Sequence, residues 1–193
     1  MTRRGSAIQP SLVVLLIWIM VSASARALTV ESDSEHLLQL GVKMFPTLVG
    51  GNLDLDNLIN ADGALTLLVL YQENRLAAQG VVNRLQASVR IIHKYPVDIR
   101  MVDVAGLSAW QTPPVAGVFL AESMVRTFLA TIQQFGNHKK TIIFSPFDGD
   151  VQQGILSGLS ISTQVKPALN LVTLRAAGIR MNPLFFKVAK TYE

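Results

Sequence analysis

The stretch LTLLVLY, which spans Leu65 to Tyr71, limits most strongly what this chain can fold into. It is an uninterrupted apolar run of strand length. Such a run is typical of a strand that is buried on both faces, as in a parallel sheet. We therefore expect helices to cover both sides of the sheet that contains it.

The segments after this run predict a β-α-β unit. Asn74 to Val89 carries apolar side chains at three- and four-residue spacing, which is typical of a helix with one buried face. Val97 to Val104 then alternates between apolar and polar side chains, which predicts a second strand. This order favours a right-handed crossover between two parallel strands.

Elements on either side extend the pattern. Near the N-terminus, Pro46 should kink or end a helix close to Phe45. After the second strand, Gly106 to Pro114 should be a loop, because two successive prolines exclude regular structure. Further elements are predicted as strands at Val115–Leu120 and Thr141–Phe144, a helix at Glu122–Phe135, and a hairpin at one sheet edge from Gly154–Thr163 and Val165–Leu171.

The fold class expected from these elements is a three-layer α/β/α sandwich. Its sheet should be mainly parallel, with an antiparallel hairpin near the C-terminus. The chain should end with a helical piece around Leu174 to Ala177, a stop at Gly178 and a last helix that begins near Pro183.

The first residues resemble a secretory signal peptide. Arg3 and Arg4 precede an apolar run from Leu12 to Val21, and Ala25-Arg26-Ala27 supplies a small-x-small cleavage site. The apolar run is about half the roughly 20 residues that a membrane-spanning helix needs. We therefore expect residues 1–27 to be removed and residues 28–193 to form one periplasmic domain. The alternative is an uncleaved N-terminal anchor.

Charge and cysteine content exclude several functions. The chain has 17 Lys and Arg against 13 Asp and Glu, but three of the arginines lie in the predicted leader, so the mature net charge is +1. There is no basic cluster beyond Lys139-Lys140, and nucleic-acid binding therefore has no electrostatic footprint. The absence of cysteine excludes thiol catalysis, cysteine-based zinc sites and iron–sulfur clusters.

The sequence contains no recognisable motif for metal binding or catalysis. His36, His93 and His138 lack the spacing of metal ligands. The acidic loop Asn52 to Gly63 has Ile59 where a calcium loop needs glycine, and no glutamate closes it. There is no nucleophile elbow and no glycine-rich phosphate loop. We therefore expect a protein that is not an enzyme and that holds no cofactor or metal.

One generic position for a ligand remains. Tyr71 and Glu73 stand at the carboxyl end of the first predicted strand, where ligands bind in open α/β sheets. They could line a crevice there. The alternative for Glu73 is a charge that complements the dipole at a helix start.

The C-terminal stretch has a distinct pattern without any catalytic motif. A strand ends in Asn170-Leu171, a short helix carries Ala176 and stops at Gly178, and the last segment contains Leu184 and Ala189. This pattern resembles the C-terminal signature of the YfiR-like family of small exported bacterial proteins. The resemblance extends over the strand from Lys140 to Phe144 and the hairpin after it.

The resemblance implies a regulator that acts by protein–protein binding. Such a protein has an α/β sandwich fold, is often dimeric, and represses the periplasmic sensor part of an inner-membrane diguanylate cyclase, which lowers cyclic-di-GMP. An outer-membrane lipoprotein can sequester it. The alternative function is a periplasmic domain that binds a small molecule for an envelope sensory or transport system.

Three aromatic residues are candidates for a protein interface. Trp110 lies in the proline-rich loop, and an exposed tryptophan often anchors contacts. Its alternative is packing onto its own domain. Phe185 and Phe186 are neighbours on the last predicted helix and cannot face the same way, so one of them is a candidate for an exposed contact.

Overall fold

The computed structural model describes residues 33–193, so the predicted leader lies outside the described residues. Leu37–Glu193 forms one compact unit. Within the described residues, eight strands form one sheet in the order β2-β3-β1-β4-β5-β6-β7-β8. The strands are β1 (Leu65–Tyr71), β2 (Ile91–Ile92), β3 (Tyr95–Asp103), β4 (Gly117–Leu120), β5 (Ile142–Ser145), β6 (Ser157–Ile161), β7 (Val165–Asn170) and β8 (Lys190–Tyr192).

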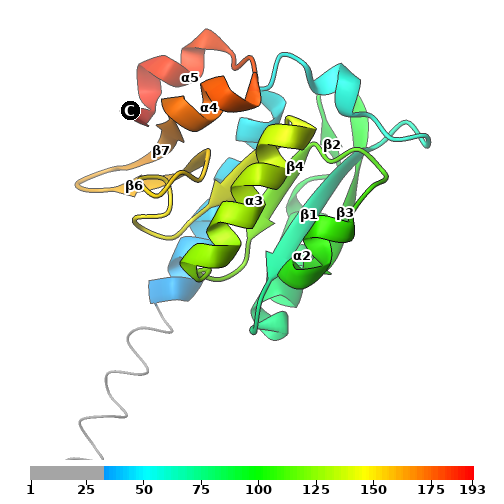
Figure 1. Cartoon of the computed structure of the whole chain (residues 1–193), viewed down its shortest axis with the longest axis horizontal. Helices are drawn as coiled ribbons and strands as arrows, with labels where there is room; N and C mark the ends of the chain where they lie inside the picture. The colour runs from blue at the N-terminus through cyan, green and yellow to red at the C-terminus, as the bar shows by residue number, and fades with distance from the viewer. Residues whose placement is uncertain (1–32) are drawn as a thin grey trace, which may run out of the picture. The chain divides into compact units, whose positions relative to one another are not determined.

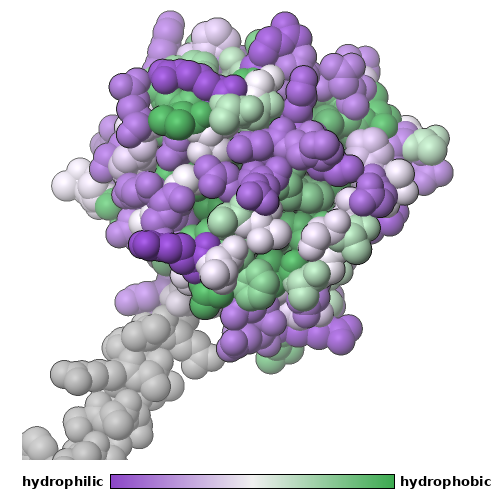
Figure 2. Space-filling view, viewed as in Figure 1, coloured by the Kyte–Doolittle hydropathy of each residue, from purple (hydrophilic) through white to green (hydrophobic). Residues whose placement is uncertain are grey.

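The helices connect and cover these strands (Figure 1). Residues 33–50 are helical and precede η1 (Leu55–Leu58), α2 (Arg75–Ser88), η2 (Val104–Ala109), α3 (Arg126–Lys139), α4 (Leu171–Ala177) and α5 (Pro183–Val188). Among residues 33–193, no helix is long and apolar enough to cross a membrane. Polar side chains cover most of the face shown in Figure 2, and hydrophobic side chains gather in patches, one of which lies over α4 and α5.

The expected parallel sheet is confirmed. β1 pairs in parallel with β3 on one side and β4 on the other, and its residues Leu65–Leu70 are all buried. β4, β5 and β6 continue the parallel pairing, and β6 and β7 form the predicted antiparallel hairpin. The hairpin does not end the sheet as expected, because β8 pairs in parallel with β7. β8 has three residues, which is too short for a periodic sequence pattern.

A cluster of three phenylalanine rings joins the N-terminal helix to one face of the sheet. The ring centroid of Phe45 lies 5.5 Å from that of Phe119 and 5.8 Å from that of Phe144. Gly117 in β4 permits this approach, since a Cβ atom there would lie 2.7 Å from the Phe45 ring. Rings at these separations stabilise a core beyond the area that they bury.

Helix α3 covers the opposite face. A Cβ atom on Gly136 of α3 would lie 2.6 Å from the side chain of Ile143. Ile143 and Phe144 are neighbours in β5, so their side chains point to opposite faces of the sheet. Helices therefore lie on both faces, as the three-layer arrangement requires, with α3 in front of the sheet and residues 37–50 behind it in Figure 1.

Two helix boundaries differ from the predictions: of the two effects predicted for Pro46, a kink or an end, the end does not occur, and the start expected at Glu122 is displaced. Pro46 does not end the N-terminal helix, which continues to residue 50 because Leu48 and Val49 are fully buried in the core. Their burial offsets the one backbone hydrogen bond that a proline removes. The helix expected at Glu122–Phe135 is α3, which begins at Arg126, because the Glu122 side chain bonds the backbone of the loop after β1.

Asn170 links β7 to α4 by two hydrogen bonds. It is buried, and its Oδ1 accepts from the backbone N–H of Thr173 at 2.9 Å. Its Nδ2 donates to the carbonyl of Val151 at 2.9 Å. Asn170 thus caps α4, which starts at Leu171 rather than at the predicted Leu174. Gly178 adopts the left-handed conformation (φ 62°) at the end of α4, so the predicted helix stop is confirmed.

Replacing Asn170 by Ala should destabilise the protein by about 2 kcal/mol, because a lost N-cap removes about 1 kcal/mol and a buried carbonyl loses its partner. Asn182→Ala is the matched control, since Asn182 caps α5 at a more exposed position. Urea denaturation measures the free energy of unfolding of both variants. Equal losses in the two variants would contradict a special role for the buried cap.

Candidate functional site

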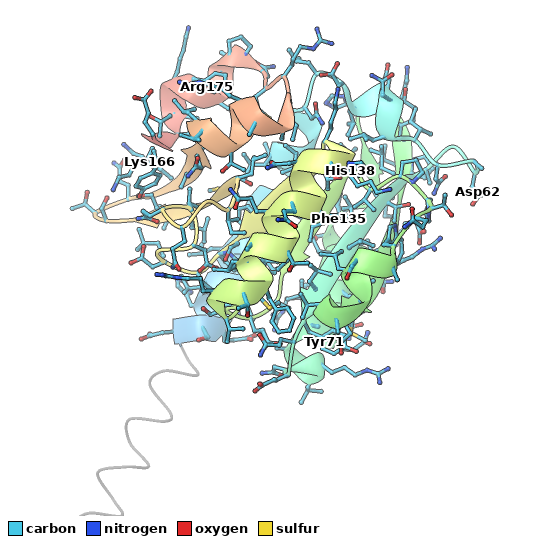
Figure 3. All side chains as sticks on the ribbon, viewed as in Figure 1. Asp62, Tyr71, Phe135, His138, Lys166 and Arg175 are labelled. Atoms are coloured by element: carbon cyan, nitrogen blue, oxygen red, sulfur yellow. The ribbon has the colours of Figure 1, made fainter. Side chains whose placement is uncertain are left out.

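β1 is the strand at which the winding of the sheet reverses. The chain crosses from β1 through α2 to β3, and then returns to β4 on the other side of β1. Ligands in open α/β sheets bind outside the carboxyl ends of the strands at such a point. Tyr71 and Glu73 lie here: Tyr71 is half-buried against the core and Glu73 is exposed. Figure 3 labels Tyr71 at this end of the molecule.

The carboxylate of Glu122, a residue of this same chain, occupies the position at the carboxyl end of β1. Its Oε1 accepts hydrogen bonds from the backbone N–H groups of Gln72 at 2.7 Å, Glu73 at 2.9 Å and Asn74 at 2.8 Å. These amides lie in the loop between β1 and α2 and end at Asn74, the N-cap of α2, where the helix dipole favours a negative charge. The position that would receive an external anion in this topology is therefore taken by a side chain from the end of β4.

Glu122→Gln should destabilise the protein, because it replaces a charged acceptor by a neutral one at three backbone amides. We expect a loss of about 1.5–3 kcal/mol, as for hydrogen bonds to charged groups. Glu73→Gln is the control, since its exposed side chain should change stability by less than about 0.5 kcal/mol. Equal midpoints of the wild type and Glu122→Gln in urea denaturation would show that the contact contributes nothing.

A buried carboxylate lies near the carboxyl end of β5. The hydroxyl of Ser145 donates to Oδ2 of Asp150 at 2.5 Å, and both side chains are buried. Burial raises the pKa of Asp150, and the hydrogen bond from Ser145 opposes that rise. Ser145 Oγ also accepts from the backbone N–H of Phe147 at 3.2 Å. These contacts hold the loop between β5 and β6, which is a structural role.

A cleft of about 430 Å³ lies at the opposite edge of the sheet, where the parallel strands begin. The loop before β1, the last residues of α3 and the segment between α4 and α5 form its walls. Its polar side chains include Asn52, Asp54, His138, Lys139, Lys140 and Arg180. His138 lies near the end of α3 at this edge, far from Tyr71 (Figure 3).

The charges in the cleft are unevenly paired. Arg180 bonds the carboxylate of Asp54, with Nε 3.1 Å from Oδ1 and 3.0 Å from Oδ2, and Nη2 also contacts Oδ1. The hydrogen bond from Arg180 lowers the pKa of Asp54. Lys139 Nζ donates to the carbonyl of Gln111 at 3.3 Å. Within the described part of the chain, the side chains of His138 and Lys140 make no hydrogen bond or ion pair, so they can meet a ligand.

Lys140 also has an unfavourable backbone conformation. It follows α3 in the left-handed region, with φ 53° and ψ 42°, and its N–H bonds the carbonyl of Gly136. Glycine or asparagine usually takes this position. For a lysine the conformation costs about 1–2 kcal/mol.

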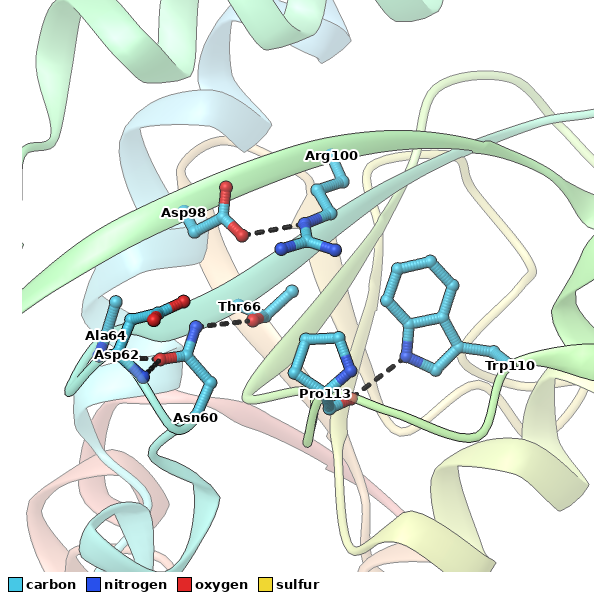
Figure 4. A network of polar contacts seen from close by, with 8 residues as sticks. All are labelled: Asn60, Asp62, Ala64, Thr66, Asp98, Arg100, Trp110 and Pro113. Atoms are coloured by element: carbon cyan, nitrogen blue, oxygen red, sulfur yellow. Dashed lines mark hydrogen bonds and ion pairs between the residues drawn. The ribbon is translucent and has the colours of Figure 1, made fainter.

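The acidic loop does not gather its carboxylates. Asp54 pairs with Arg180, whereas Asp56 accepts a hydrogen bond from the hydroxyl of Tyr95 at 2.8 Å. Asn60 shapes the turn, since its Oδ1 accepts from the backbone N–H groups of Asp62 and Ala64 (Figure 4). Among residues 33–193, no group of three or more His, Cys, Asp or Glu side chains could hold a metal ion.

The aromatic residues proposed for an interface differ in exposure. Trp110 is half-buried, its Nε1 donates to the carbonyl of Pro113 at 3.0 Å, and the Arg100 guanidinium lies 6.0 Å from its ring (Figure 4). It therefore packs onto its own domain. Phe185 packs against the core beside Gly51, while Phe186 is 40% exposed.

The residues of the C-terminal signature lie on or next to α4 and α5. Asn170 and Gly178 cap α4, and Leu171 is half-buried at its start. Ala176 is exposed on α4, and Ala189 is half-buried after α5. Leu184 on α5 is 63% exposed, which capping or core packing does not explain.

Sequence reasoning missed the residues that matter most at both edges. The sequence predicts Glu122 at a helix start, and nothing in the local sequence indicates that its partners lie 48 to 50 residues earlier. Arg180 belongs to no motif in the sequence, although it meets Asp54 across the cleft. The pair Lys139-Lys140 was the available signal, since it is the basic cluster of the mature sequence.

Comparisons with known proteins give a fold but no family. No family model and no curated protein matches the chain. A substrate-binding protein with adhesive properties from Clostridium difficile, in its ligand-free open form, matches with a TM-score of 0.51 and 14% identity over 74% of this chain and 58% of that chain.

Two other solved structures are similar at a lower level. An ABC domain in complex with L-Trp from Streptococcus pneumonia has a TM-score of 0.47, 12% identity, and coverage of 75% of this chain and 60% of that chain. A conserved domain protein from Vibrio cholerae has a TM-score of 0.46, 12% identity and the same coverage of 75% and 60%. The chain thus spans 60% or less of each matched structure. At these identities the likeness shows an α/β fold alone.

Proposed function

We propose that this chain is an exported binding domain without catalytic activity, which takes up a small polar ligand in the cleft beside Lys140 and Arg180. It would serve an envelope sensory or transport system. The observation that carries the proposal is the cleft itself, whose wall includes His138 and Lys140, the two charged or titratable side chains there without a hydrogen bond or ion pair in the described structure. Its volume of about 430 Å³ falls in the range of about 300–1,000 Å³ for small-molecule sites.

Two further observations support a ligand at this edge. The alternative position at the carboxyl ends of β1 and β4 already holds the Glu122 carboxylate, so it is not open to an anion. The fold is also shared with a substrate-binding protein from Clostridium difficile. That match concerns the fold, so the choice of site depends on the cleft.

A melting-temperature screen of small polar molecules tests the proposal. A ligand present at one hundred times its Kd stabilises a folded protein by about 2.7 kcal/mol. For a chain of this size that corresponds to a rise in Tm of about 5–10 °C. Asn57→Trp should abolish the shift, because Asn57 is an exposed residue of the cleft wall.

Gln86→Trp on the exposed side of α2 is the matched control and should keep the shift. Shifts that survive Asn57→Trp would place binding elsewhere. A broad screen with no shift for any molecule would overturn the proposal.

A second candidate function is the protein-binding regulator that the YfiR-like resemblance implies. The observation that favours it is α5, in which no residue is buried. Leu184 and Val188 are 63% and 57% exposed, and their four-residue spacing places them on one helix face. Hydrophobic side chains also show at the surface over α4 and α5 in Figure 2. Exposed apolar residues that gather in this way often contact a partner.

Under this second function the partner is the periplasmic part of a membrane diguanylate cyclase, with an outer-membrane lipoprotein and a second copy of the chain as further binding partners. Deleting the protein should then raise cyclic-di-GMP, and the wild-type chain should restore the low level. The double variant Leu184→Ser, Val188→Ser should not restore it. Leu76→Ser is the control, because Leu76 is 84% exposed on α2. Unchanged cyclic-di-GMP after deletion would exclude this function.

A further inference from the structure

The left-handed backbone conformation at position 140 does not require a lysine side chain. A glycine could take the same left-handed backbone conformation without a Cβ in the way. Non-glycine residues in this region of φ/ψ space cluster at binding sites, where the side chain is required. Here the side chain lies in the wall of the cleft.

Stabilisation of the end of α3 accounts for only some of the basic residues in the cleft. His138 and Lys139 stand in the last turn of α3, where cations complement the negative end of the helix dipole. Lys139 also bonds the Gln111 carbonyl, and Arg180 is held by Asp54. Lys140 lies beyond the last turn, and its ammonium has no hydrogen bond or ion pair in the described structure.

The cleft therefore has a surplus of positive charge. Lys139, Lys140 and Arg180 face one carboxylate, that of Asp54. Asp54 fixes the guanidinium of Arg180 in one orientation, which leaves fewer rotamers to be lost when a ligand binds. Asn52 and Asn57 add amide groups to the wall. Cations in a fixed arrangement, together with amide donors, suit a small anion.

We propose that the cleft binds a small anion that carries a carboxylate or phosphate group, with Lys140 as its main cationic contact. Arg180, oriented by Asp54, and His138 supply further contacts from the cleft wall. This inference rests on the proposed ligand-binding function and names the chemical class of its ligand.

The test measures binding to the full chain by calorimetry and by melting temperature. The probes are inorganic phosphate, succinate and citrate, with glucose as a neutral probe, all at an ionic strength matched with sodium chloride. Matching is needed because salt screens exposed charges over about 10 Å at 0.1 M. Phosphate against succinate and citrate distinguishes the two anionic groups.

Three variants distinguish the loss of the Lys140 charge from a loss of folding. Lys140→Gln removes the charge and keeps a side chain in the left-handed conformation. Lys140→Gly removes the charge and relieves the backbone, so it should melt at the same temperature as the wild type or higher. Lys166→Gln makes the same charge change on β7, at an exposed position away from the cleft. We expect both Lys140 variants to weaken anion binding at least tenfold, and Lys166→Gln to change it less than twofold.

The possible outcomes have different meanings. Anion binding that is lost in both Lys140 variants and kept in Lys166→Gln supports the proposal, because the Lys140→Gly result cannot be ascribed to unfolding. Equal weakening in all three variants shows general charge attraction and overturns it. Binding of glucose without any anion overturns the ligand class and leaves the binding function in place. If a broad screen also finds no ligand, both proposals fail.

Discussion

The burial of β1 on both faces is the constraint on which the other layers depend. Leu65–Leu70 have no contact with solvent, and burying a leucine side chain stabilises a fold by about 1.5–3 kcal/mol. That stabilisation requires a cover on each side. The N-terminal helix supplies one through Phe45 and the rings of β4 and β5, and α3 supplies the other over Ile143. Gly117 and Gly136 stand where these helices come closest.

The two edges of the sheet differ in how their polar groups are satisfied. At the carboxyl edge, three backbone amides of the loop between β1 and α2 share one carboxylate oxygen of Glu122, so the edge is closed by the chain itself. At the opposite edge, the loops are joined by an exposed pair between Asp54 and Arg180, and the Lys140 ammonium has no partner among the described residues. Unpaired charge beside a cleft is what a binding site requires, whereas a closed edge contributes stability. This contrast places the proposed ligand site away from the position that the sheet topology favours.

The sequence predicted the parts of the fold that depend on local patterns. The apolar run of β1, the spacing in α2 and the alternation in β3 each lie within one segment, and all three elements formed as expected. The start of α3 could not be predicted, because it depends on Glu122 meeting a loop distant in sequence. The continuation of the N-terminal helix past Pro46 could not be predicted for a similar reason, since it depends on the burial of Leu48 and Val49 in the core. The cleft was missed entirely, because Asp54, Lys140 and Arg180 come from three separate segments and carry no shared motif.

The two candidate functions meet at one segment of the chain. Residues 178–182 form part of the cleft wall and lead directly into α5. Backbone hydrogen bonds fix this segment to the loop before β1: Leu53 N–H donates to the Arg180 carbonyl at 2.8 Å, and Asn182 N–H donates to the Gly51 carbonyl at 2.8 Å. An anion on Arg180 and a partner on Leu184 would thus act on the same short connection. Proximity alone does not couple them, since a ligand shifts a second equilibrium only by the difference in its affinity for the two states. Arg180 offers such a difference, because a ligand that binds the guanidinium in the orientation set by Asp54 favours the state in which this side-chain contact between the segment and the loop is formed.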